Sequence, residues 1–227
     1  MTRRTNARIA GFTFLFYIAA GITSMVLFNR ATSAVGTAAK LASIAQHLSD
    51  VRITIVLGLL TCMSALVLAV TLYAITRDED PDLALLALTC RVCEGVIGAN
   101  FMRTLGLIWL ATAGTGAGVP DASAADALGT FLLKVPPGGG SAAALFAVGS
   151  TLFCYLLLRG RIVPVALGWL GVLASVLLVV LLPAELAGFL RGPVTSFMWI
   201  PMAVFEVTVA LWLLIKGAAM PARRQSA

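Results

Sequence analysis

The chain has 227 residues, of which 60% are hydrophobic and only 11% are charged, and its formal net charge is +6. Soluble domains are about half apolar and about a quarter charged, so this composition is typical of a membrane protein. Apolar helices of about 20 residues use nearly the whole chain, which excludes a soluble catalytic domain of ordinary size. The basic residues gather near the ends of apolar segments and form no basic stripe with interleaved aromatic residues, so we expect no nucleic-acid binding.

The apolar stretches predict an all-α polytopic integral membrane protein, a single domain over residues 1–227 built as a bundle of six transmembrane helices. In chain order, the expected spans are residues 9–28, 51–76, 82–113, 141–158, 165–187 and 196–215. The first span follows a basic leader but is longer than the apolar core of a signal peptide, so we interpret it as an uncleaved helix. The third span would be about 45 Å long, and we expect it to tilt or to project from the membrane.

Two shorter segments predict amphipathic helices outside the bundle. The segment 37–50, which follows the first span, places apolar residues at the i, i+3, i+4 and i+7 positions of one helix face. After the third span, Ser123 with Asp126 resembles a capping box ahead of a short apolar face. At the end of the chain, residues 218–227 are expected to form a disordered cytoplasmic tail.

The distribution of basic residues predicts the orientation of the bundle. With both termini in the cytoplasm, nine Lys and Arg residues lie near helix ends on the inner side and five on the outer side. We therefore expect a multi-pass protein of the bacterial cytoplasmic membrane, with the lipid bilayer as its surroundings and with both termini cytoplasmic.

Three charged residues lie at depths in these spans where a charge is costly. Measured by helical rise from Asp82, Arg91 is about 13 Å deep and Glu94 about 18 Å deep. The two are three residues apart on one helix, so their side chains can pair directly. Glu206 lies near the middle of the last span, where an unpaired carboxylate is unfavourable. We therefore predict one interior ligand or proton site that contains Arg91, Glu94 and Glu206.

Pro201 supports this hypothesis, because a proline inside the last span would remove one helical hydrogen bond and kink the helix beside Glu206. Asn100 projects from a different side of the third span, so we do not include it in the predicted site. Two interpretations of the charges stay open: a structural clamp that fixes helix packing, or a site for an anionic headgroup, a proton or a small polar solute.

Cysteine and histidine residues predict no metal centre and no cofactor. Cys90 and Cys93 form a CxxC, but it lies several turns inside an apolar helix, where burial favours unreactive thiols. A dithiol enzyme that also uses Cys154 is conceivable. The single histidine, His47, lies on the polar side of segment 37–50, whereas a zinc site needs four good ligands.

Short motifs along nearly the whole chain resemble a bacterial family of six-helix membrane proteins known as a domain of unknown function, DUF4386. They are Ala7-Arg8-Ile9-Ala10-Gly11, Arg91-Val92-Cys93-Glu94, and Phe205-Glu206 followed by Leu211-Trp212-Leu213-Leu214-Ile215-Lys216-Gly217. The resemblance implies a six-span integral membrane protein and no assigned reaction.

Three functional hypotheses follow from the sequence. The leading one is a membrane protein, more a binder than an enzyme, that binds or moves a small polar or anionic ligand in an interior pocket. The second is a membrane-embedded enzyme that uses an intramembrane glutamate as acid or base. The third is an accessory structural subunit of a membrane complex.

Overall fold

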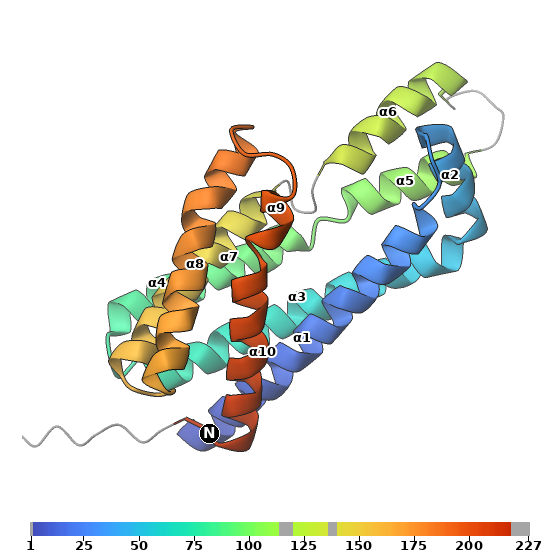
Figure 1. The fold of residues 1–227 in the computed structure, drawn as a ribbon. Coiled ribbons are helices and arrows are strands. Elements are labelled where there is room, and N and C mark those ends of the chain that lie inside the picture. Colours follow the sequence, from blue (N-terminus) through green and yellow to red (C-terminus); the bar gives the residue numbers. More distant parts are fainter. Residues whose placement is uncertain (1, 114–119, 136–139, 219–227) are drawn as a thin grey trace, which may run out of the picture.

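The fold is taken from a computed structural model that describes residues 2–113, 120–135 and 140–218. All regular elements in these ranges are helices (Figure 1): α1 (Arg3–Ala31), α2 (Thr37–Gln46), α3 (Leu48–Thr76), α4 (Pro81–Gly98), α5 (Met102–Thr112), α6 (Ala122–Lys134), α7 (Ser141–Arg159), α8 (Val165–Leu186), α9 (Val194–Phe197) and α10 (Ile200–Ile215). The all-helical architecture agrees with the sequence. Apart from residue 218, the predicted tail lies outside the described residues.

Six of the helices form a closed ring. The helix α1 packs against α3, α3 against α4, α4 against α7, α7 against α8 and α8 against α10, and α10 returns to pack against α1. Each of these helices therefore contacts the ring helix before it and the one after it in the chain. Figure 1 shows the closure, with the C-terminal end of α10 beside the N-terminal end of α1.

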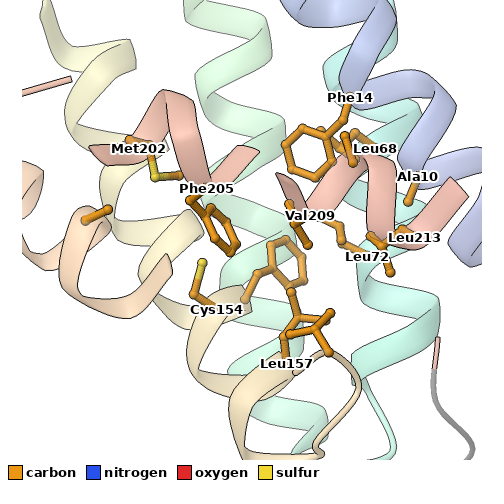
Figure 2. Close-up of a cluster of buried hydrophobic side chains, with 14 of the residues drawn as sticks. Ala10, Phe14, Leu68, Leu72, Cys154, Leu157, Met202, Phe205, Val209 and Leu213 are labelled. Atoms are coloured by element: carbon orange, nitrogen blue, oxygen red, sulfur yellow. The ribbon is translucent and has the colours of Figure 1, made fainter. Parts of the chain in front are cut away.

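Buried apolar side chains fill the end of the ring that lies nearest the N-terminus. Figure 2 shows Phe14 of α1, Leu72 of α3, Leu157 of α7 and Val209 of α10 converging there, and all four are at most 6% exposed. Lipid tails are as apolar as these side chains, so close packing rather than removal from water holds such helices together. The cluster fixes the relative positions of helices that are distant in the sequence.

A second apolar cluster lies at the opposite end of α1 and α3, where α2, α5 and α6 gather into what we call the cap (Figure 1). The helices α1 and α3 have 29 residues each and are therefore about 43 Å long, longer than a hydrocarbon core of about 30 Å. The apolar face predicted for segment 37–50 is partly confirmed, since Leu41 and Ile44 are buried there. They pack in a cluster with residues of α3 and α5 such as Val51 and Leu107.

The continuous helix predicted for residues 82–113 is wrong, because the chain breaks into α4 and α5. The break covers residues 99–101, and the side-chain oxygen of Asn100 accepts a hydrogen bond from the amide of Met102 (3.0 Å). Asparagine competes with helical hydrogen bonding in this way, and Gly98, the last residue of α4, disfavours a helix. The break directs α5 into the cap instead of continuing the line of α4 (Figure 1).

The last span also differs from the prediction. Val194–Phe197 forms the short helix α9, and α10 begins at Ile200, so Pro201 occupies the first turn of α10. A proline in a first turn removes no interior hydrogen bond, because the amides there have no intrahelical acceptor. Pro201 therefore starts the helix that carries Glu206 and does not kink it.

Five helical segments of the described chain are long and apolar enough to cross a membrane: α1, α3, α7, α8 and Val194–Ile215, which combines α9 and α10. The helix α4 is not among them, and its 18 residues include the charged side chains of Asp82, Arg91 and Glu94. The arrangement of six spans therefore stays a prediction, and it depends on whether α4 spans the membrane inside its ring of neighbours.

The start of α6 corrects a further prediction. Asp121, and not the expected pair of Ser123 and Asp126, caps this helix: its side chain accepts hydrogen bonds from the amide of Ala124 and from the hydroxyl of Ser123, both at 2.8 Å. The bond from the Ala124 amide is the main reason that the pKa of Asp121 lies below its usual range. The cap is therefore fully formed above the ordinary aspartate pKa of about 3.9 and is lost as the pH falls through the lower, folded value.

We expect Asp121→Ala to loosen the first turn of α6, because the substitution removes the acceptor of the Ala124 amide. Amide hydrogen exchange in that turn should become faster at neutral pH. Asp121→Asn, which keeps an acceptor oxygen, should exchange like the unaltered protein. Unchanged exchange in the alanine variant would contradict this assignment of the cap.

The closure of the ring depends on Gly11 of α1. A Cβ atom at this position would lie 2.5 Å from the carbonyl oxygen of Ala210 and 2.6 Å from the amide nitrogen of Leu214, both in the backbone of α10. Backbone atoms cannot rotate away as a flexible side chain can. The absence of a side chain at Gly11 therefore permits the close helix crossing, as small residues commonly do in membranes.

The substitution Gly11→Ala should destabilise the protein by about 1–3 kcal/mol through overpacking at this crossing. Gly21→Ala on the same helix is the matched control, since no heavy atom lies within 4 Å of a Cβ placed there. Thermal unfolding in detergent measures both variants. Equal melting temperatures for the two would show that α1 and α10 do not meet at Gly11.

Candidate functional site

The centre of the site is a buried ion pair within α4. The Nη1 atom of Arg91 lies 2.7 Å from the Oε2 atom of Glu94, and the two side chains are 2% and 10% exposed. The predicted pairing of these residues one turn apart is thus present in the structure. The guanidinium carbon of Arg91 also lies 4.7 Å from the centre of the Phe146 ring on α7, a geometry that favours a cation.

A glycine on α7 makes room for the arginine. A Cβ atom at Gly149 would lie 3.0 Å from Cγ of Arg91 and 3.1 Å from Cβ of Cys90. The arginine stem therefore packs directly on the surface of α7, with Phe146 one turn away covering its charged head. Contacts with α7 thus hold Arg91 at both ends of its side chain.

Tyr17 of α1 belongs to the site and is absent from the sequence prediction. Its hydroxyl lies near Glu94, and its electrostatic neighbours are Glu94, Arg91 and Glu206. The signal that could have found it is the spacing of buried residues along α1, where Ala10 and Phe14 precede Tyr17 at helical intervals of four and three. A lone tyrosine in an apolar helix otherwise gives no sign of a distant partner.

Glu206 of α10 lies close enough to Arg91 and Glu94 for both to act on it electrostatically. The residue is 8% exposed, and its Oε1 atom has no hydrogen-bond partner among the described residues. A buried carboxylate oxygen without a partner is unusual, because the loss of hydration is then uncompensated. The structure thus brings together the three residues predicted from the sequence, and Glu206 is the one that forms no ion pair among the described residues.

Glu94 and Glu206 both line a cavity of about 460 Å³, which we call the inner cavity. Its walls come from five of the six ring helices, all except α8, and from Trp199 before α10. Small residues leave the space open: Gly21, Gly58, Ala65, Gly95, Gly98, Ala142, Ala143 and Ala203. Arg91 is not in the wall of this cavity and instead borders a much smaller space that is also lined by α1, α3, α7 and α10.

Asn100 and the cysteines contribute little to this site. Asn100 does not line the inner cavity. Of the CxxC pair, Cys90 is buried and Cys93 is exposed, and both are free thiols. Cys62 does line the cavity, but its thiol donates a hydrogen bond to the Gly95 carbonyl (3.0 Å). Within the described ranges, no three His, Cys, Asp or Glu side chains are placed to hold a metal ion together.

We expect Arg91→Met to cost about 3–5 kcal/mol of stability, because it leaves the carboxylate of Glu94 buried without its partner. Adding Glu94→Gln should recover most of that loss and give a strong coupling energy in a double-mutant cycle. Thermal unfolding in detergent is the measurement.

Arg159→Met is the matched control for this prediction. Its partner Asp80 lies 3.1 Å away, but the two side chains are 40% and 29% exposed, and such pairs contribute at most about 1 kcal/mol. If Arg91→Met loses no more stability than Arg159→Met, the buried pair does not stabilise the protein as predicted.

The comparison with known proteins places the chain in a family. A family model described as "Domain of unknown function (DUF4386)" matches residues 9–217, and the chain belongs to this family. No curated protein and no solved structure matches the chain. The matched range contains Tyr17, Arg91, Glu94 and Glu206, and the description of the family carries no function.

Proposed function

We propose that this member of the DUF4386 family is a multi-pass membrane protein that binds a small polar ligand, specifically a small organic cation, in its inner cavity. The observation that carries the proposal is the placement of charge around the cavity. The carboxylates of Glu94 and Glu206 are in its wall, whereas the guanidinium of Arg91 is not. A ligand in the cavity therefore contacts the two acidic groups and not the guanidinium.

The balance of charge supports a cation over an anion. Arg91 is the pairing partner of Glu94 at 2.7 Å, so it compensates one carboxylate. Glu206 keeps an oxygen without a hydrogen-bond partner. A bound cation would supply that partner and would replace the hydration that Glu206 loses on burial. An anion in the same place would face two carboxylates without direct contact with Arg91.

Aromatic side chains in the cavity wall favour an organic cation in particular. Tyr17, Phe146 and Trp199 all line the cavity, and the ring centres of Phe146 and Trp199 lie 6.0 Å apart. Aromatic faces attract alkylated ammonium groups, and this effect is strongest where water is excluded. One face of Phe146 already contacts Arg91, so Trp199 and Tyr17 are the rings that remain for a ligand.

For its surroundings, we propose the bacterial cytoplasmic membrane with both termini in the cytoplasm and α4 as a sixth span. The nine-to-five distribution of basic residues supports this orientation. The ring of six helices supports the span count, because an even number of crossings returns the C-terminus to the side of the N-terminus. Packing against α3 and α7 shields the charges of α4 from lipid, as an intramembrane ion pair requires.

A binding experiment with choline, a quaternary ammonium ion, tests this function. Choline chloride should raise the melting temperature of the protein in detergent, relative to sodium chloride at the same concentration. Glu206→Gln should weaken the binding by about tenfold or more, since a hydrogen bond or contact to a charged group contributes about 1.5–3 kcal/mol. Glu185→Gln, which removes a carboxylate outside this cavity, should bind choline like the unaltered protein.

Sodium acetate provides the opposite arm of the experiment. If acetate stabilises the protein and choline does not, the cavity selects anions and the proposed cation site is wrong. If Glu185→Gln weakens choline binding as much as Glu206→Gln does, the effect comes from the overall charge of the protein and not from the cavity.

A further inference from the structure

A second cavity, which we call the cap cavity, lies between the ring and the cap. Its volume is about 510 Å³, and its walls come from α1, α2, α3, α5, α6, the end of α4 and the break between α4 and α5. It shares Gly21, Ser24, Gly58 and Gly98 with the inner cavity, so the two spaces are neighbours. Its charge character is opposite: Lys40 and Arg103 are in the wall, and no described carboxylate is.

Contacts within the protein hold Arg103 in place but leave its charge unpaired. Its Nε atom donates to the Leu132 carbonyl (2.8 Å), and its guanidinium carbon lies 4.6 Å from the centre of the Phe28 ring. Neither Arg103 nor Lys40 forms an ion pair within the described part of the chain. An ordered, uncompensated guanidinium that shares a cavity wall with a lysine is a favourable arrangement for an oxyanion.

Neutral polar groups in the wall add further hydrogen-bond donors. The side-chain oxygen of Asn100 accepts from the Met102 amide, so its NH₂ group is the part left to donate to a ligand. Thr104 brings a hydroxyl group to the same space, whereas the hydroxyl of Thr54 donates to the Val51 carbonyl (2.7 Å). Two cationic side chains, an amide donor and a hydroxyl together suit the several oxygens of a phosphate group better than the two of a carboxylate.

From this arrangement we infer that the cap cavity is a binding site for a phosphate group, held between Lys40 and Arg103. The phosphate can belong to a lipid headgroup or to a soluble phosphate, since the recognised chemistry is the same. Met25 in the wall is 56% exposed, and the neighbouring Met102 is 71% exposed, so apolar surface adjoins the site as a lipid would require. This inference does not rest on the proposed cation site.

The test measures stabilisation of the purified protein in detergent by three probes. Phosphatidylglycerol carries the phosphate on a lipid, diacylglycerol is the same lipid without the phosphate, and inorganic phosphate is compared with chloride at equal ionic strength. Stabilisation by phosphatidylglycerol and not by diacylglycerol supports the site with a lipid as its source. Stabilisation by inorganic phosphate supports the site with a soluble source. If none of the phosphate probes stabilises the protein, the inference is wrong.

Variants then locate the binding. Lys40→Gln and Arg103→Lys should each weaken the effect of the phosphate probe by about tenfold, the first through loss of charge and the second through loss of the planar guanidinium. Arg30→Gln is the control, because Arg30 lies at the same end of α1 but outside the cavity wall and is 3.9 Å from Asp50. An equal loss in Arg30→Gln would mean that the phosphate binds to general surface charge, which would overturn the inference.

The variant Lys40→Gln should still bind choline. The experiments therefore distinguish an error in the proposed phosphate site from an error in the proposed cation site.

Discussion

The buried ion pair between Arg91 and Glu94 is the constraint on which the rest of the structure depends. Two charges in apolar surroundings must be paired and enclosed, because each alone is strongly unfavourable in lipid. The helix α4 meets this requirement by packing between α3 and α7, with the arginine against Gly149 and Phe146. Enclosure on the remaining side comes from α1 and α10, which bring Tyr17 and Glu206 to the same place.

Small residues determine how tightly the ring closes and where it stays open. At Gly11 the backbones of α1 and α10 touch, so nothing larger than hydrogen fits at the crossing. Farther along α1, a Cβ atom placed at Gly21 would meet no atom of a neighbouring helix within 4 Å, and Gly21 borders both cavities instead. The same residue type therefore allows close packing at one end of the helix and leaves space at the other, because its neighbours differ.

The inner cavity and the cap cavity have four lining residues in common. The charged side chains in their walls are opposite in sign, acidic in the inner cavity and basic in the cap cavity. A cation that approached Glu206 from the cap would pass Lys40 and Arg103, which repel it unless a phosphate group is bound there. Phe101 packs against Gly58, a residue that lines both cavities. A Cβ atom at Gly58 would lie 2.6 Å from a carbon of the Phe101 ring, so the ring occupies the space that a side chain there would need. The two proposed sites would then influence each other through charge, even though their ligands differ.

Local patterns in the sequence determined the helical architecture, most helix positions, and the pairing of Arg91 with Glu94. These features depend on apolar runs, helical spacing and the cost of burying charge, all of which act over a few residues. Only the tertiary structure decided the approach of Tyr17 to Glu94 and the position of Arg91 behind the cavity wall. The physical reason is that these features depend on contacts between helices far apart in the chain, and on which face of each helix its neighbours cover, which no local pattern of residues encodes.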